Sequence, residues 1–111
     1  MPRKHGHNPP PIRAMIDLHI PANLFYPELP GGSIQYFRYA PFLRERCIQI
    51  HVHTTRMPHH EEAALEIRTI KIRRYEAPAG ASFLAELEFL TERAIEASET
   101  NPDKSIIQPI G

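Results

Sequence analysis

Two short segments contain the side chains best suited to chemistry. Asp17-Leu18-His19 and His51-Val52-His53 each place two polar groups two residues apart. On a β-strand this spacing puts both groups on the same face. If the two strands are neighbours, the four polar side chains converge within reach of one metal ion. Imidazole and carboxylate groups suit zinc and other transition metals. The candidate metal ligands are Asp17, His19, His51 and His53.

The same residues also fit an ordinary polar sheet face without a ligand, because neither their spacing nor their number is diagnostic. The sequence contains no phosphate loop, no dinucleotide-binding fingerprint and no Ser-His-Asp signature. We therefore favour a protein that is not an enzyme. It has no cofactor unless the His/Asp cluster binds zinc or another transition metal, which is the first alternative function.

A second group of candidate residues is basic. Beside the aromatic residues Tyr36, Phe37 and Tyr39, these side chains could form a stacking platform with a basic rim for single-stranded nucleic acid. The whole chain, however, has 13 basic and 13 acidic residues and a pI near 7.1. Because a nucleic-acid-binding protein usually has an excess of positive charge, this function is an alternative and is not favoured. The residues concerned are Arg68, Lys71, Arg73 and Arg74.

Aromatic residues predicted to lie on the surface indicate protein binding. Phe25 belongs to an apolar, proline-rich loop, Tyr39 to a strand with aromatic residues on both faces, and Phe89 to the acidic back of a helix. Aromatic side chains often anchor protein interfaces. The favoured function is a small interaction module, such as an adaptor, inhibitor or accessory subunit. It would bind another protein or itself, as a homo-oligomer, through an uncovered sheet face or the helix back.

The elements that position these residues follow from hydrophobic periodicity. Alternation of apolar and polar residues predicts four strands, which cover residues 12–20, 33–40, 47–55 and 64–75. In the last strand the apolar phase changes between Arg68 and Ile70, which predicts a β-bulge or a change of sheet face. A first helical turn at 61–65 is the alternative for the start of this segment.

One helix is predicted near the end of the chain, over residues 83–98, with Ser82 as its N-cap. Glutamates occupy its back, together with Phe89, and Asn101-Pro102 ends it. Its apolar stripe follows a period of 3.6 residues. The stripe consists of Phe83, Leu87, Leu90, Ala94 and Ala97, widened by Leu84 and Ile95.

These elements predict an α+β domain, in which an antiparallel four- to five-stranded sheet has one C-terminal amphipathic helix packed on one face. Residues 1–11 form an extended or disordered, basic, proline-rich arm, 12–100 the single domain, and 101–111 a C-terminal tail that could add a strand. The only cysteine, Cys47, lies in a strand and has no internal disulfide partner. No signal peptide or membrane-length apolar run is present, so we expect a cytoplasmic protein without a membrane partner.

Overall fold

The structure, a computed structural model, describes residues 15–23, 30–56 and 63–108, with the backbone alone for 30–35. The predicted arm at 1–11 and the loop residue Phe25 lie outside these ranges. The described elements are β1 (Ile16–Pro21), α1 (Pro30–Glu45), β2 (Ile48–Thr55), β3 (Ala64–Ile67), β4 (Ile70–Tyr75), α2 (Phe83–Ser98), a 3₁₀ turn η2 (Pro102–Lys104) and β5 (Ser105–Ile107).

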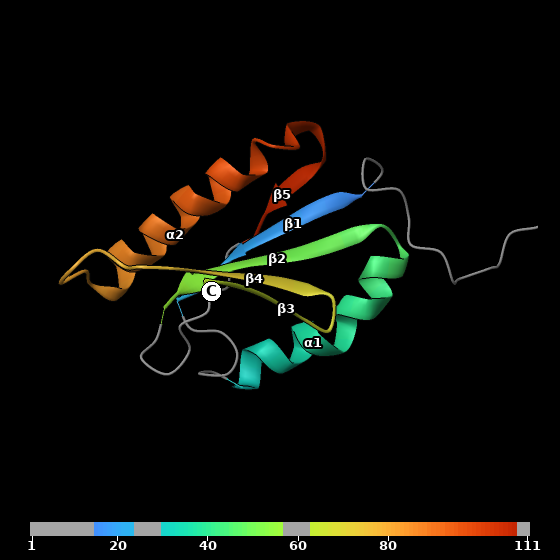
Figure 1. Cartoon of the computed structure of the whole chain (residues 1–111), viewed down its shortest axis with the longest axis horizontal. Helices are drawn as coiled ribbons and strands as arrows, with labels where there is room; N and C mark the ends of the chain where they lie inside the picture. The colour runs from blue at the N-terminus through green and yellow to red at the C-terminus, as the bar shows by residue number, and fades with distance from the viewer. Residues whose placement is uncertain (1–14, 24–29, 57–62, 109–111) are drawn as a thin grey trace, which may run out of the picture.

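The five strands form one twisted sheet in the order β3-β4-β2-β1-β5 (Figure 1). β2 runs parallel to β1 and β4, β5 runs parallel to β1, and β3 is antiparallel to β4. Parallel neighbours need a crossover instead of a tight turn, and α1 provides it between β1 and β2. The prediction of an α and β domain with a five-stranded sheet is confirmed, but the prediction of a purely antiparallel sheet is wrong.

Helix α1 occupies the segment 33–40 that was predicted to be a strand, and the prediction of one C-terminal helix is therefore also wrong. The α1 side chains that pack against the core recur every three or four positions, which is the spacing of one helix face. They are Tyr36, Phe37, Ala40 and Leu43. Helix formation thus brings to one side two adjacent aromatic residues that a strand would divide between its faces. Pro41 lies within the helix.

The core lies between α1 and the apolar face of the sheet. Ile50 and Val52 alternate along β2, as predicted, and both are fully buried together with Ile20, Ile70 and Ile72. Burying one such side chain contributes about 1.5–3 kcal/mol to stability. This face therefore supplies much of the driving force for folding.

The predicted long strand 64–75 is a hairpin. Arg68 and Thr69 form its two-residue turn, and both have positive φ angles, of 50° and 70°. Two successive positive φ angles are typical of the type I′ turn, whose twist matches that of paired strands. The change of apolar phase therefore marks a reversal of the chain, and the predicted bulge or change of face is wrong. Ala64 begins β3, so the alternative helical turn is absent over the described residues 63–65.

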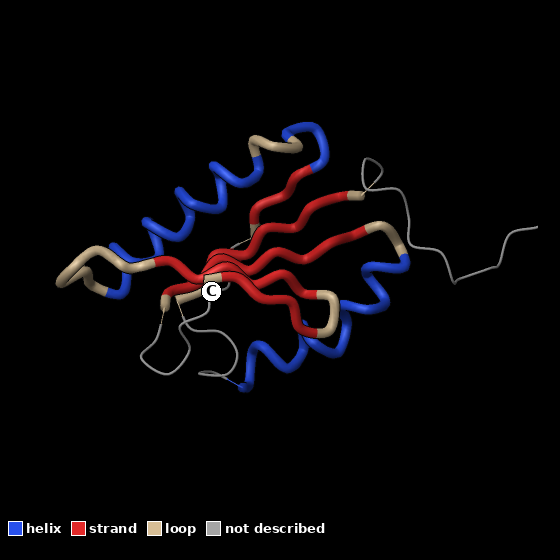
Figure 2. The backbone as a smooth tube through the Cα atoms, viewed as in Figure 1, coloured by secondary structure: helices blue, strands red, loops and turns tan. Residues whose placement is uncertain are grey.

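Helix α2 covers residues 83–98, as predicted, and packs against the other face of the sheet over β1, β5 and part of β2 (Figure 2). The Ser82 side chain accepts a hydrogen bond of 3.1 Å from the Ala85 amide, which confirms the N-cap. Leu90 and Ala94 of the predicted stripe are buried, but its first residue, Phe83, is exposed, and so are the predicted flanks Leu84 and Ile95.

The buried face of α2 extends instead toward Phe89. This ring is half-buried, contacts the Tyr75 ring edge-on at 6.3 Å between centroids, and has the Arg93 guanidinium 4.9 Å from its centre. The prediction that Phe89 is exposed on the acidic back is therefore wrong. Beyond α2, the predicted tail supplies β5 at the sheet edge. No helix in the described ranges is long and apolar enough to cross a membrane.

Candidate functional site

The parallel pairing of three strands aligns polar side chains in rows across the sheet face opposite α1. In one row His19 of β1 lies beside His51 of β2, and His51 lies beside Lys71 of β4. In the next row His53 lies beside Arg73. Because residues two apart on a strand share a face, the rows form one continuous polar surface. The condition set by the sequence for the four polar side chains to converge, that the strands of Asp17 and His51 are neighbours, is thus met.

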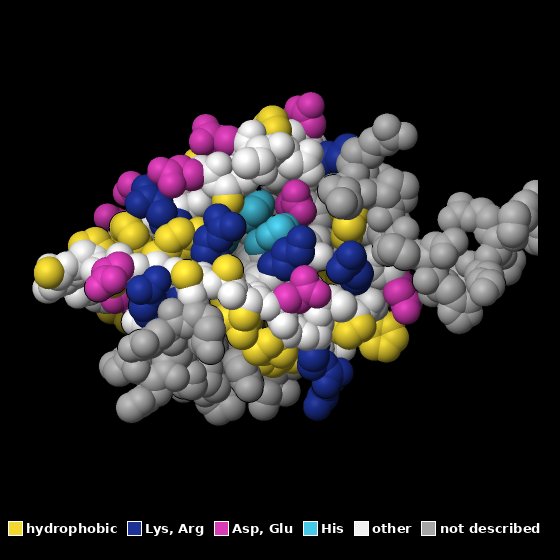
Figure 3. Space-filling view, viewed as in Figure 1, with side chains coloured by type: hydrophobic (Ala, Val, Ile, Leu, Met, Phe, Trp, Pro, Cys, Tyr) yellow, Lys and Arg dark blue, Asp and Glu magenta, His cyan; other side chains and the backbone are white. Residues whose placement is uncertain are grey.

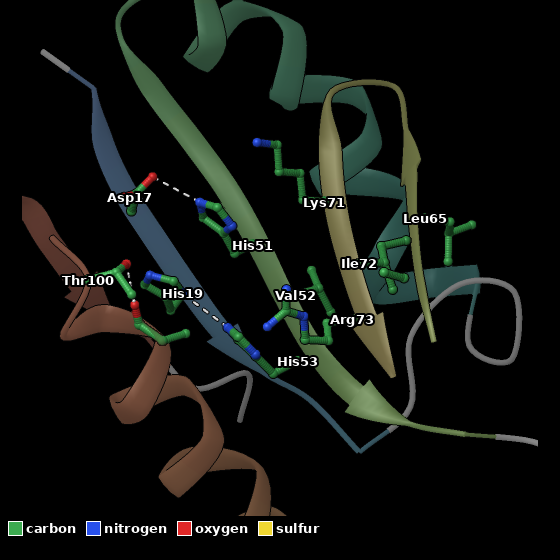
Figure 4. A pocket seen from close by; sticks show the side chains of 12 residues that line it. Asp17, His19, His51, Val52, His53, Leu65, Lys71, Ile72, Arg73 and Thr100 are labelled. Carbon is green, nitrogen blue, oxygen red and sulfur yellow. Dashed lines mark hydrogen bonds and ion pairs between the residues drawn. The ribbon is translucent and has the colours of Figure 1, made fainter. Parts of the chain in front are cut away.

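Direct contacts join the polar groups at the centre of this surface (Figure 4). The His51 Nε2 atom is 2.8 Å from Asp17 Oδ1, and the His19 Nδ1 atom is 2.9 Å from His53 Nε2. The rings of His19 and His51 stack, with 4.6 Å between their centroids. Asn101, just after α2, donates to the second Asp17 oxygen at 3.1 Å. The four predicted residues therefore lie together.

Three of them lie close enough together to be candidate ligands of one metal ion. One ligand atom each from Asp17, His19 and His51 lies within 4.8 Å of the other two. Around a bound zinc ion, ligand atoms are about 3.4 Å apart, given metal–ligand bonds of about 2.1 Å. To bind an ion, these side chains would rotate so that the three ligand atoms come closer together. His53 is outside this group and lies behind His19, in contact with its Nδ1 atom.

The local environment sets the protonation states that metal binding requires. Burial lowers the pKa of His19 to about 4 and that of His53 to about 3. Burial also lowers the pKa of His51, although the hydrogen bond to Asp17 opposes the shift. For Asp17, burial alone would raise the pKa, but hydrogen bonds with His51 and Asn101 bring it below the usual value. Near neutral pH the imidazoles are neutral and the carboxyl is ionised, as metal ligands must be.

A hydrogen-bonded chain fixes the His19 ring. Tyr75 Oη is 2.8 Å from His53 Nδ1, and His53 Nε2 contacts His19 Nδ1. In one of the two proton arrangements, His19 donates from Nδ1 to His53, and His53 donates from Nδ1 to Tyr75. That arrangement leaves the lone pair of His19 Nε2 free to bind a metal. Partners of this kind orient metal-ligating histidines and raise their basicity.

The cluster lines one side of a pocket of about 480 Å³. Lys71 and Arg73 of β4 border the pocket on one side, and Ala97 and Thr100, at the end of α2, border it on the other. Figure 3 shows histidine surface in this region, flanked by basic and acidic side chains. Because α2 covers only part of the polar face, the cluster remains open to this pocket.

The four basic residues of the nucleic-acid hypothesis do not form one surface. Lys71 and Arg73 face the pocket, Arg74 is buried on the opposite side of β4, and Arg68 lies in the hairpin turn. The aromatic residues of the predicted platform are on α1, where Tyr36 and Phe37 pack against the core. A flat strand surface of stacked aromatic and basic groups is therefore not formed by these residues.

Of the predicted interaction residues, Tyr39 is exposed on α1, Phe89 is half-buried and Phe25 lies outside the described ranges. Sequence reasoning missed Tyr75 and Asn101 as partners of the histidine cluster, and it did not connect Lys71 and Arg73 with that cluster. The alternation of Lys71, Arg73 and Tyr75 along β4 was the available signal. It becomes informative only once β4 is known to pair with β2.

Comparison with known proteins gives no match: no family model fits the chain, and no curated protein or solved structure resembles it detectably.

Proposed function

We propose that the protein binds a divalent transition-metal ion through Asp17, His19 and His51. The supporting observation is the convergence of three ligand atoms within 4.8 Å at a pocket wall. Two imidazoles and one carboxylate are the ligands of catalytic zinc sites and of non-haem iron sites. The ion would replace the proton that His51 shares with Asp17.

An open site suits this arrangement better than a structural one. Structural zinc sites have four protein ligands, whereas catalytic sites have three and leave a position for water or substrate. Here three ligands from two strands adjoin a pocket of about 480 Å³, large enough for a small molecule. The proposed function is therefore that of a metal-dependent enzyme, the alternative that the sequence raised and did not favour.

Metal titration of the full chain tests this proposal. Cobalt(II) is a suitable probe, because its visible absorption reports the number and type of ligands, and zinc can then be added in competition. We expect one ion per chain in the wild type. Asp17→Asn, His19→Gln and His51→Gln should each weaken binding by more than the roughly 10–100-fold that loss of an outer partner costs. His53→Gln should fall within that range, because His53 contacts a ligand and not the ion.

Asp103→Asn is the matched control for Asp17→Asn, since Asp103 is an exposed carboxylate of η2 that does not line the pocket. Circular dichroism of each variant shows whether it folds. The proposal is wrong if folded wild-type protein binds no stoichiometric ion, or if Asp17→Asn and His51→Gln bind cobalt as the wild type does.

Protein binding, the function favoured from sequence, is a second candidate. It is supported by Tyr39 and Phe42 on α1, which are 55% and 60% exposed. Exposed aromatic residues of this kind are typical of interface anchors. Sedimentation velocity of the wild type and of Tyr39→Ser/Phe42→Ser tests self-association. An identical monomeric profile for both proteins would remove this evidence for a homo-oligomer.

A further inference from the structure

Two positively charged side chains lie beside the histidine cluster and line the same pocket. Lys71 is the cross-strand neighbour of His51, and Arg73 is the neighbour of His53. Figure 4 shows both side chains extending from β4 on the side of the sheet that bears the histidines. Both residues are largely exposed to the pocket, so their charged groups remain accessible to a ligand.

Neither cation is neutralised by a carboxylate in the described part of the chain. The ion pairs there involve other residues, and Glu66, the cross-strand neighbour of Lys71, forms no salt bridge with it. Arg73 does hydrogen-bond Tyr75. A guanidinium has five N–H donors, however, so this contact leaves several for a ligand.

The pocket therefore has an excess of positive charge. Among the described residues, its lining contains one carboxylate, Asp17, against two side chains with a fixed positive charge, Lys71 and Arg73. The formal charge of this lining is +1, and a divalent ion at the proposed site would bring it to +3. An occupant with negative charge is the natural complement of such a pocket.

We propose that the pocket binds a small molecule with a terminal phosphate group, held by Lys71 and Arg73 on β4. This ligand class goes beyond the proposed metal site. The part of the proposal in which a phosphate oxygen also contacts the ion rests on that metal site. A phosphate monoester presents three free oxygens and a charge near −2. These match two separate cations and a metal better than the two oxygens and single charge of a carboxylate. The arginine offers paired donors suited to phosphate.

The pocket dimensions favour a small molecule over a polymer. A volume of about 480 Å³ lies within the range of small-ligand sites. Of the other basic residues considered for nucleic-acid binding, Arg74 is buried on the other face of the sheet and adds no charge to the pocket surface. The apolar part of the lining, which includes Ala97, would contact the body of the ligand.

Phenyl phosphate and benzoate form a matched pair of probes, because both join an anionic group to one aromatic ring. Nuclear magnetic resonance titration of the metal-free and the zinc-loaded full chain measures their dissociation constants. We expect phenyl phosphate to bind both forms, more tightly with zinc and more tightly than benzoate. Lys71→Gln and Arg73→Gln should each weaken binding by about tenfold, the cost of one charged hydrogen bond.

Arg68→Gln and Lys104→Gln are the controls, because each removes an exposed cation that does not line the pocket. The inference is overturned if phenyl phosphate binds neither form, or if it binds no more tightly than benzoate. It is also overturned if the control variants weaken binding as much as Lys71→Gln and Arg73→Gln do. Displacement of phenyl phosphate by a single-stranded oligonucleotide lacking terminal phosphates would also overturn it, in favour of a nucleic-acid site.

The two forms separate this inference from the metal proposal. If zinc does not bind but metal-free protein binds phenyl phosphate through Lys71 and Arg73, the phosphate site stands and the metal site fails. If zinc binds through Asp17 and His51 while phenyl phosphate binds neither form, the metal site stands and the phosphate site fails.

Discussion

The two faces of β2 are both largely buried, but by different kinds of side chain. On one face Ile50 and Val52 pack beneath α1, where each gains stability from the exclusion of water. On the other face, over part of which α2 packs, His53 is buried and His51 stays partly exposed. Burying an imidazole costs free energy unless its nitrogens find hydrogen-bond partners. The comparison teaches that one strand separates an apolar face that stabilises the fold from a polar face that we propose to bind ligands.

The most direct test of this difference between the two faces of β2 is to substitute adjacent residues on opposite faces. Ile50→Ala should lower the free energy of unfolding by about 2–5 kcal/mol, because it leaves a cavity in a fully buried site. His51→Gln should have a much smaller effect on stability but abolish strong cobalt binding. Urea denaturation and metal titration measure the two effects. A large loss of stability in His51→Gln, with metal affinity retained, would reverse the assignment of the faces.

Acid should lower the free energy of unfolding of the protein through its buried histidines. The folded-state pKa values of His19 and His53, about 4 and 3, lie below the unfolded value of 6.5. Below pH 6.5 the unfolded chain therefore binds protons that the folded chain does not. The contribution of these two histidines to the free energy of unfolding of the metal-free protein is fully present above that pH. It is lost progressively as the pH is lowered toward 4. Each histidine contributes a slope of at most about 1.4 kcal/mol per pH unit.

Denaturation midpoints at a series of pH values measure this slope. His53→Gln should make it shallower by about one histidine's contribution, whereas Ser98→Ala, which removes no titratable group, should leave it unchanged. Equal slopes in the wild type and His53→Gln would contradict the burial of a neutral imidazole at this position.

The helix that covers the histidine face depends on its cap. Ser82→Ala removes the acceptor of the Ala85 amide and should lower the free energy of unfolding by about 1 kcal/mol. Metal affinity should be unchanged, because Ser82 is at the far end of α2 from the pocket residues Ala97 and Thr100. Ser98→Ala, near the other end of the helix, is the control for stability. A fall in cobalt affinity in Ser82→Ala would indicate that α2 as a whole positions the ligands.

The smallest expected effect is at the hairpin that brings Lys71 and Arg73 to the site. Arg68 and Thr69 adopt positive φ angles, which are costly for residues with side chains, above all for a β-branched threonine. Replacing the pair by Asn-Gly, the preferred type I′ sequence, should stabilise the protein by up to about 1 kcal/mol. Thermal unfolding measures the gain, and phenyl phosphate binding should not change. A loss of stability would argue against this turn.

Sequence periodicity was sufficient for the elements whose pattern has one interpretation. β2 alternates strictly, and α2 has both a cap and a stripe, so their existence and most of their bounds were predictable. The segment 33–40 fits two patterns, since its residues alternate as in a strand, and Tyr36, Phe37 and Ala40 also lie on one helix face. Pro41 disfavoured the helix, and only packing of Tyr36 and Leu43 against the sheet decides between the two structures.

The prediction of a strand at 33–40, where α1 lies, also limited what could be predicted of the site. Asp17, His19, His51 and His53 were identifiable because each pair shares a strand face. With α1 taken for a strand, the crossover that makes β1 parallel to β2 was invisible, and so was the pairing of β2 with β4. Lys71 and Arg73 could then be read only as a separate basic group. Their place beside the histidines depends on contacts between strands, which no local pattern contains.

The rows of polar side chains also bear on how the strands find their alignment. Apolar alternation repeats every two residues, so β1 could slide by two positions along β2 and still present Ile20 to the core. Such a slip would move His19 about 7 Å from its place beside His51, and in one of the two directions it would also separate Asp17 from His51. The apolar face tolerates this error, whereas the polar face does not. The contacts of the histidine cluster thus favour the native register of β1 and β2 over shifted registers that would still bury apolar side chains.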